Sequence, residues 1–265
     1  LIHPVFAAYI FEDGFESNDF SEWTGTYVQE GSTLVVQNTT KYQGTYAAKA
    51  DLEAWDGYAW CYKSITAQTT AFMRAYVRLA TNPESGKQVY FIVLAGNYWT
   101  DRIVEGGIHN DNGTLKWKLR YWDDNTSGYL SSILASPNPS LNTWYCLEIK
   151  AVVNGGGSGE ARLYVDGTEE LTVTGLTNDD KGSVDYVWAG LDALEITNNV
   201  AQTGYVDCVV VDDEYIGEIS EEEEKNFYGT INPQFTINHA STCTFNRYTI
   251  INPTLTIDSS VISSA

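Results

Sequence analysis

Basic side chains are scarce in this 265-residue chain. Its 15 lysines and arginines stand against 35 aspartates and glutamates, for a formal net charge of -20. A surface this acidic repels a polyanion, so nucleic acid is excluded as a partner. No stretch approaches the roughly 20 apolar residues of a membrane span, and the sequence therefore predicts no membrane segment.

Cysteine is sparse as well, with Cys61, Cys146, Cys208 and Cys243 as the only four. None of them has the C-x-x-C spacing of a zinc or redox site, which excludes a thiolate metal centre. Their even number predicts at least one disulfide in a secreted protein, and buried free thiols are the alternative.

Several features predict an extracellular or cell-surface location. The chain begins at Leu1 instead of Met, and its first residues do not form a complete signal peptide, so we expect a processed N-terminus. Three Asn-x-Ser/Thr sequons are predicted glycosylation sites: Asn38, Asn112 and Asn125.

Residues that favour β-structure are plentiful, among them 18 tyrosines and 8 tryptophans. Apolar and polar residues alternate along 71–80 and 114–122, as in half-buried strands. Residues 144–173 predict two successive hairpins, the second with a tight turn at Asp166-Gly167. This pattern predicts an all-β chain built as an antiparallel sandwich. On the expected polar faces of the two alternating segments lie Phe72, Arg74, Tyr76 and Arg78, and Lys116, Lys118, Arg120 and Trp122.

Five segments resemble, in order, a known superfamily. They are YIFEDGFESNDFSEWTGT, KYQGTYAAKA, NTWYCLEIKAV, EARLYVDGTEEL and YVDCVVVDDEYIGE, and they resemble elements of the laminin G-like, concanavalin A-like lectin and glucanase jelly rolls. The resemblance covers about residues 8–219 and implies a jelly-roll β-sandwich. Because relatives often hold calcium where the first and last strands meet, it also implies a structural Ca²⁺ site at Glu16, Asp207 and Asp13.

The superfamily does not give a function, since it contains lectins, hydrolases, lyases and structural modules. Glucanase members carry an E-x-D-x-E motif on one strand, and the nearest acids here, Asp51/Glu53 and Asp212/Glu214, lack the third carboxylate. Lyase members rely on Arg-rich and Gln-x-His strands. No G-x-S-x-G elbow is present. The three histidines are expected in the N-terminal arm, a loop and a repeat: His3, His109 and His239. These absences predict that the protein is not an enzyme.

The end of the chain repeats itself with a 20-residue offset, as NFYGTINPQFTINHAS and NRYTIINPTLTIDSSV. We expect an N-terminal arm at 1–10, a sandwich at 11–219, an acidic hinge at 220–225 and the two β-rich repeats at 226–265. Two such repeats bury too little surface to fold alone, so they must dock on something.

The leading hypothesis is a non-enzymatic structural subunit of an extracellular filament, fibre or coat. Copies of the chain would assemble by β-strand exchange through the repeats. The predicted assembly residues are Tyr228, Ile231, Phe235, Ile237, Tyr248, Ile251, Leu255 and Ile257.

Carbohydrate binding is the competing hypothesis, in the form of a secreted lectin-like module, and a glycoside hydrolase or polysaccharide lyase is the third. Sugars stack on exposed rings and bond to arginine. The candidate glycan-binding residues are Arg74, Tyr76, Arg78, Trp55, Trp60 and Trp99; rings that only fill the sandwich are the alternative for most of them.

Overall fold

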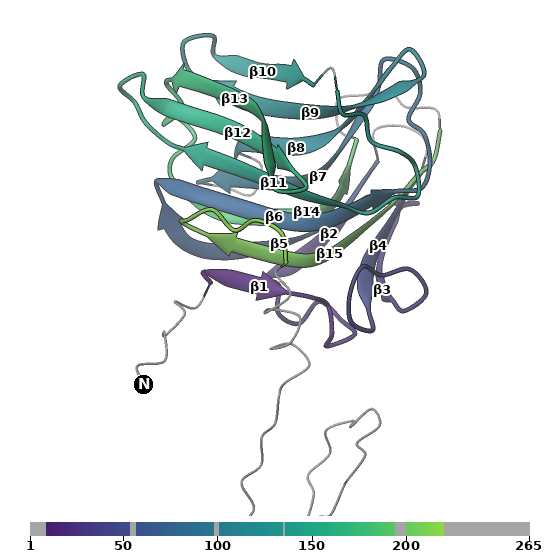
Figure 1. Cartoon of the computed structure of the whole chain (residues 1–265). Coiled ribbons are helices and arrows are strands. Elements are labelled where there is room, and N and C mark those ends of the chain that lie inside the picture. The colour runs from purple at the N-terminus through teal and green to yellow at the C-terminus, as the bar shows by residue number, and fades with distance from the viewer. Residues whose placement is uncertain (1–8, 54–56, 98–100, 135, 194–199, 220–265) are drawn as a thin grey trace, which may run out of the picture. The chain divides into compact units, whose positions relative to one another are not determined.

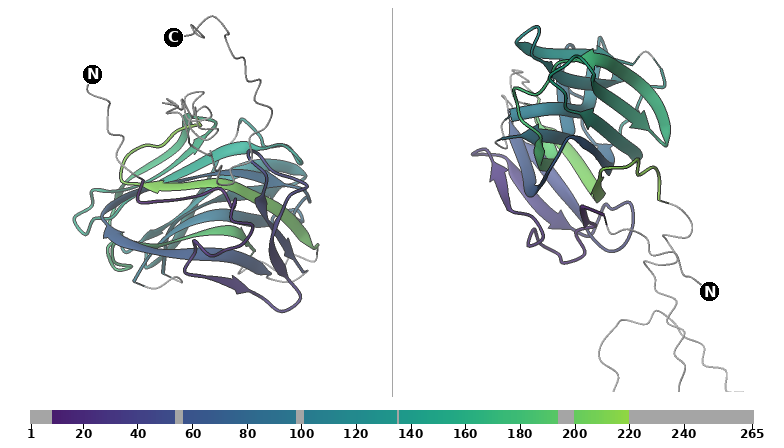
Figure 2. Two further views of the ribbon diagram at one scale, coloured as in Figure 1. Left: turned by 90° about the horizontal axis from the view of Figure 1, so that it is seen from below. Right: turned by 90° about the vertical axis from the view of Figure 1, so that its left-hand side faces the viewer.

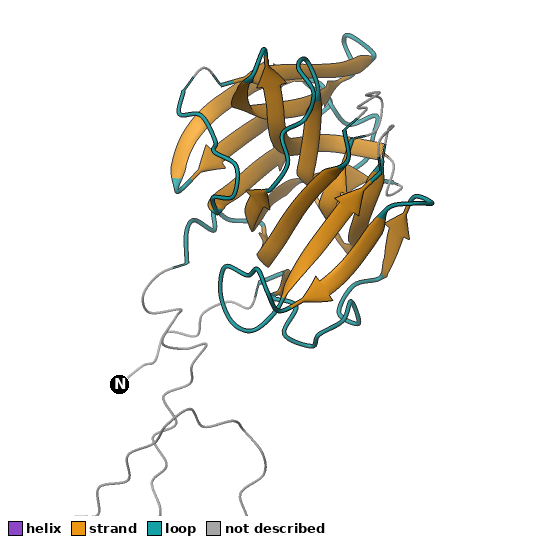
Figure 3. Ribbon diagram, turned by 90° about the vertical axis from the view of Figure 1, so that its right-hand side faces the viewer, coloured by secondary structure: helices purple, strands orange, loops and turns teal. Residues whose placement is uncertain are grey.

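The structure is a computed structural model that describes residues 9–53, 57–97, 101–134, 136–193 and 200–219. All regular structure in these ranges is β-strand, as Figure 3 shows. Within the same ranges, no helix has the length and apolarity that crossing a membrane requires. The chain divides into two units, residues 1–219 and 220–265, and every described strand belongs to the first.

The larger sheet has eight strands. Its order is β13-β12-β11-β6-β15-β4-β3, and β1 pairs with β15 (Figure 1). The first and last strands therefore lie together, antiparallel, near the middle of the sheet. The strands are β1 (Phe11–Asp13), β3 (Thr33–Gln37), β4 (Ala47–Leu52), β6 (Thr70–Leu79), β11 (Tyr145–Val152), β12 (Gly159–Val165), β13 (Thr168–Leu176) and β15 (Gln202–Asp212).

The second sheet has seven strands in the order β10-β9-β8-β7-β14-β5-β2, and it forms the other layer of the sandwich (Figure 2). All its pairings are antiparallel. The strands are β2 (Gly25–Val28), β5 (Tyr58–Gln68), β7 (Gln88–Gly96), β8 (Asp101–Asp111), β9 (Thr114–Asp123), β10 (Gly128–Ile133) and β14 (Val184–Asp192).

One hydrophobic core fills the space between the sheets. Alternate residues of each strand enter it, including Met73 and Val77 from β6 and Trp117 and Leu119 from β9. Burying such side chains contributes about 1.5–3 kcal/mol each relative to exposure. The residues between them necessarily point to the outer face of their sheet. The predicted antiparallel β-sandwich and both predicted alternations are confirmed.

The predicted hairpins are confirmed too. β11, β12 and β13 pair in succession, and the turn between β12 and β13 is Asp166-Gly167. Both turn residues have positive φ, 46° and 73°, which matches the twist of the strands that they join. Asn112 and Gly113 form a similar turn between β8 and β9, with φ of 51° and 96°.

The repeats at 226–265, with their eight predicted assembly residues, lie outside the described residues, as do the acidic hinge at 220–225 and residues 1–8 of the arm. The predicted domain boundaries therefore stay predictions.

Candidate functional site

The outer face of the seven-stranded sheet carries basic and aromatic side chains. Since Leu115, Trp117 and Leu119 of β9 enter the core, Lys118 and Arg120 point outward, where β8 and β7 add polar groups of their own. The two predicted basic clusters lie on different sheets, because β6 with its arginines belongs to the other layer. They do not form one patch.

A buried ionic network lies on this outer face. Arg102 donates to Glu105 Oε1 at 2.9 Å and to Asp192 Oδ2 at 2.5 Å, while Arg120 Nε lies 3.1 Å from Glu105 Oε2. All four side chains are buried. Two cations thus face two anions, and this compensation makes their burial tolerable. The network fixes Arg120 beside its neighbours on β9.

Lys118, by contrast, pairs with no carboxylate of the described residues. Its Nζ donates to Gln88 Oε1 at 3.0 Å, and only 8 % of the residue is exposed. Burial and the nearby charge of Arg120 lower the pKa of Lys118, and the charge of Glu105 offsets only part of this effect. A buried cation of this kind has an unmet preference for an anion.

His109 lies on strand β8, diagonally across from Lys118 on the neighbouring strand β9. The prediction that it sits in a loop is wrong: it pairs with Gln88 on β7 and with Lys116 on β9. Its Nδ1 is buried and has no hydrogen-bond partner in the described part of the chain. Burial and the charge of Lys118 lower the pKa of His109, so the imidazole is neutral at neutral pH and able to accept a proton.

Tyr90 completes the group, in the row of residues that crosses β7, β8 and β9 as Tyr90, Gly107 and Lys118. Its ring is fully buried, and its hydroxyl makes no hydrogen bond of normal geometry to a described residue. Burial raises the pKa of Tyr90 far above its usual range, which keeps the hydroxyl protonated. Gly107 leaves room for the ring, because a Cβ there would lie 2.9 Å from Tyr90 Cδ1.

The group formed by Gln88, Tyr90, His109, Lys118 and Arg120 is called the β7–β9 site below. It contains a cation without a carboxylate, a neutral imidazole and a protonated phenol on three adjacent strands. Sequence reasoning found the outward direction of Lys118 and Arg120 but not the site. The missed signal was Asn112-Gly113, a tight hairpin turn that requires strand up to Asp111.

Beside this site the outer face is aromatic. Trp60, a predicted glycan-binding residue, lies on β5 and is fully buried, with its ring stacked on Trp188 at 4.5 Å. Arg102 lies 4.9 Å from the centre of the Trp188 ring. Trp60 therefore supports the sheet and does not present a surface to a sugar. The other two predicted tryptophans, Trp55 and Trp99, lie outside the described residues.

Arg74 and Tyr76, predicted to bind glycan, are covered on the outer face of the eight-stranded sheet. Arg74 Nη1 donates to the Gly217 carbonyl at 3.1 Å, and the Tyr76 hydroxyl accepts from the Ile219 N–H at 3.0 Å. Each residue is 3 % exposed, so the predicted role needs a correction for both. Arg78, farther along the same strand, is half-buried.

The three predicted calcium ligands serve the backbone and side chains of the protein instead. Asp13 accepts the Trp23 indole N–H at 2.6 Å, and Glu16 and Asp207 accept backbone N–H groups of residues 42–46. Among the described residues, these three carboxylates do not approach one another as one ion requires. The arrangement suits caps on loop backbones better than a calcium site, and calcium binding stays a prediction.

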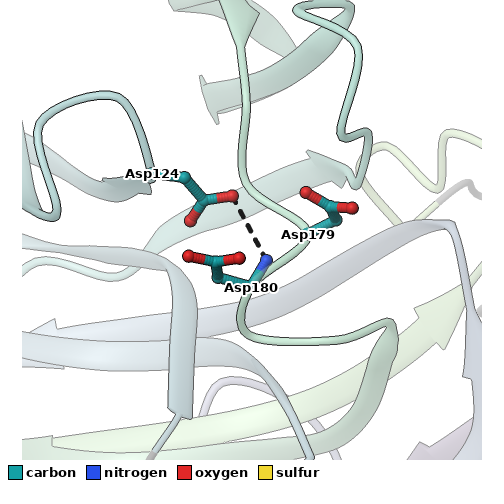
Figure 4. Close-up of side chains that lie close together, drawn as sticks. All are labelled: Asp124, Asp179 and Asp180. Atoms are coloured by element: carbon teal, nitrogen blue, oxygen red, sulfur yellow. Dashed lines mark hydrogen bonds between the residues drawn. The ribbon is translucent and has the colours of Figure 1, made fainter.

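A different acidic group does come together, at Asp124, Asp179 and Asp180 (Figure 4). Asp124 Oδ2 accepts the backbone N–H of Asp180 at 3.2 Å, which ties the loop after β13 to the end of β9. Asp179 and Asp180 are exposed. No sequence pattern signals this group, because Asp124 lies 55 residues before Asp179 and all three aspartates come from ordinary turn sequences.

The predicted disulfide is absent from the described cysteines. Cys61, Cys146 and Cys208 are free thiols, and burial raises the pKa of Cys146 to about 12. Cys243 lies outside the described residues. The three sequon asparagines are exposed, so glycosylation stays a prediction that the structure permits: Asn38, Asn112 and Asn125.

Comparison with known proteins was made by sequence and by structure. No protein-family model and no curated protein sequence matches the chain. A solved structure described as cellulose induced protein Cip1 aligns with a TM-score of 0.57 and 17 % identity, over 78 % of this chain and 99 % of its own. An endo-β-1,4-glucuronan lyase from the fungus Trichoderma reesei aligns with 0.56 and 15 %, over 77 % and 95 %. Alginate lyase Aly36B aligns with 0.50 and 15 %, over 81 % and 95 %.

These likenesses confirm the jelly-roll β-sandwich. They also correct two predictions. The three structural neighbours are carbohydrate-related proteins, two of them polysaccharide lyases by name, and none of the three is described as a filament or coat subunit. The leading hypothesis of a non-enzymatic structural subunit is therefore wrong, and so is the exclusion of an enzyme, which depended in part on placing His109 in a loop.

Proposed function

We propose that the protein acts on an acidic polysaccharide, whose uronate units bind at the β7–β9 site and are cleaved there by β-elimination. One observation carries the proposal: Lys118 is a buried cation that pairs with no described carboxylate, and it lies beside His109, a neutral imidazole with an unpartnered Nδ1. The carbohydrate-related fold neighbours support it at the level of fold. Membership of the concanavalin A-like superfamily and a secreted location are parts of the same proposal.

The positive charge of the β7–β9 site is the reason that it would bind an acidic sugar. The carboxylate of a uronate would pair with Lys118 and Arg120, which would satisfy the cation that the protein leaves unpaired. The Tyr90 hydroxyl would donate a hydrogen bond to the same substrate unit. A neutral sugar offers no such compensation. The local charge therefore selects an acidic polymer even though the whole chain carries -20.

The neutral imidazole of His109 is the group that would start the cleavage. Pairing the carboxylate with cations acidifies the C–H bond next to it, and His109 would take that proton as the general base. The electron pair of the C–H bond forms a carbon–carbon double bond, and the bond to the 4-oxygen breaks. The imidazolium returns its proton to the leaving oxygen. The products are one new reducing end and one unsaturated uronate, with no water consumed.

The test uses the full chain with polyglucuronate, alginate and cellulose as probes. We expect the ultraviolet absorbance of an unsaturated uronate to rise with an acidic polymer and not with cellulose. His109→Gln should abolish turnover and leave binding within about threefold, whereas Lys118→Gln should raise KM at least about tenfold. Lys150→Gln is the matched control, because Lys150 is a half-buried lysine that lies on β11 of the other sheet and pairs with Glu160 at 2.8 Å.

The outcomes separate the hypotheses. Binding of an acidic polymer without any unsaturated product would support the lectin-like alternative and refute the lyase. If neither Lys118→Gln nor His109→Gln changes binding or turnover, the β7–β9 site is not the functional site.

A further inference from the structure

The geometry points to a second carbohydrate-binding site, on the outer face of the eight-stranded sheet, which takes an anionic sugar. Three rings form it, those of Tyr42, Trp144 and Tyr205, and the guanidinium of Arg78 lies beside them. These four residues are called the aromatic shelf. It belongs to the opposite layer of the sandwich from the β7–β9 site, so the inference does not rest on the proposed function.

The three rings of the aromatic shelf contact one another in sequence through Trp144, and they are partly exposed. The Trp144 ring contacts both tyrosine rings, with centroids 6.1 Å from Tyr42 and 6.3 Å from Tyr205, and its plane is inclined to them by 65° and 60°. Tyr42 is 42 % exposed, and the other two rings are half-buried. Inclined rings with accessible faces are what the apolar faces of sugars stack on.

The shelf is held rigid from below. The Tyr42 ring stacks on buried Tyr76 at 3.6 Å, nearly parallel at 13°. The backbone N–H groups of Tyr42 and Gln43 donate to Asp207 Oδ2 at 2.9 and 3.2 Å. Tyr205 is itself part of strand β15. Ordering these rings would therefore cost little free energy when a ligand binds.

The positive charge of Arg78 favours an anionic ligand. Its guanidinium lies 5.2 Å from the centre of the Tyr205 ring, and Nη2 donates to the Asn142 carboxamide at 2.9 Å. No ion pair joins Arg78 to a carboxylate of the described residues, whereas the nearby Lys49 is paired with Asp51 at 2.7 Å. The remaining N–H donors of Arg78 match a carboxylate or sulfate on a sugar stacked beside them.

The size of the shelf favours a sugar over a protein. Adjacent centroids about 6 Å apart place the three rings within roughly 12 Å, enough for about two sugar units. A stable protein interface needs roughly 800 Å² from each partner, several times the area that three partly buried rings and one guanidinium present. A polymer that reached both sites would gain from avidity.

The test uses the full chain carrying His109→Gln and Lys118→Gln, so that the β7–β9 site is disabled, and titrates it with an oligoglucuronate and with a neutral cello-oligosaccharide of equal length. We expect saturable binding of the oligoglucuronate. Trp144→Ala and Tyr42→Ala should each weaken it about tenfold. Arg78→Gln should remove the preference for the acidic probe and the salt dependence. Tyr27→Ala is the matched control, since Tyr27 is 40 % exposed but lies on β2 of the other sheet.

Failure of the shelf and failure of the proposed function are distinguishable. If the oligoglucuronate no longer binds once Lys118 and His109 are replaced, the shelf is overturned and the β7–β9 proposal stands. If the shelf variants lose binding of the oligoglucuronate while Lys118→Gln alone changes neither binding nor turnover, the shelf stands and the β7–β9 proposal is overturned. Equal binding of both probes, unaffected by Arg78→Gln, overturns the anionic specificity.

Discussion

Asp207 provides a quantitative test of how the eight-stranded sheet is held together. Its side chain is fully buried, and its two oxygens accept the backbone N–H groups of Tyr42, Gln43 and Cys208. Burial raises the pKa of Asp207 to about 6 from an ordinary 3.8, although these three hydrogen bonds act in the opposite direction. The folded protein therefore holds a proton on this carboxyl more tightly than the unfolded chain does.

The sign of the pH dependence follows. Between pH 3.8 and about 6 the folded state binds more protons at Asp207 than the unfolded state, so this residue's contribution to stability falls as the pH rises through that window. From pH 5 to pH 7 the loss is about 1 kcal/mol. Asp207→Asn keeps a carbonyl oxygen for the N–H groups but cannot titrate. The variant should therefore lose about 1 kcal/mol of this pH dependence.

Urea unfolding at pH 5 and pH 7 measures the effect. The free energy of unfolding of the unmodified chain should fall between the two pH values by about 1 kcal/mol more than that of Asp207→Asn. Asp180→Asn, at an exposed position, is the control and should keep the original dependence. Parallel behaviour of the unmodified chain and Asp207→Asn would refute the assignment of a buried titrating carboxyl that anchors residues 42 and 43.

Two further predictions concern the seven-stranded sheet. Gly107→Ala would place a Cβ 2.1 Å from the Val89 carbonyl oxygen, so we expect a loss of at least about 2 kcal/mol, seen as a lower Tm; an unchanged Tm would contradict the close approach of β7 and β8. Arg102→Met would remove the cation that pairs with Asp192 and one of the two arginines that pair with Glu105, and it should cost about 3–5 kcal/mol in urea unfolding. Stability equal to that of the unmodified chain would show that the network is solvated.

Local pattern predicted much of the fold. Alternation on β6 and β9 identified which residues enter the core, and Asp166-Gly167 identified a turn, because both signals depend only on neighbouring residues. The polar run from His109 to Thr114, by contrast, resembles a loop. Its first three residues complete β8, and pairing of His109 with Gln88 depends on a contact 21 residues away.

The strand pattern also does not predict whether another segment of the chain covers the outer face of a sheet. Alternation correctly placed Arg74 and Tyr76 on one side of β6, away from the core. It held no information on the segment from Asp213 to Ile219, which returns over that side and bonds to both residues. The same strand pattern is compatible with an open or a covered face. Only the three-dimensional path of the chain after β15 decides between them.

The scarcity of basic residues is the feature that carries most information about the site. With 35 acidic residues, a carboxylate at a suggestive position is common by chance, and Asp13, Glu16 and Asp207 indeed serve neighbouring N–H groups. The 15 basic residues are different, because an acidic protein can easily pair every one of them. Lys118 is buried without an ion pair to a described carboxylate, which is costly, and the charge of Glu105 offsets only part of that cost. The carboxylate of the proposed substrate would offset the rest.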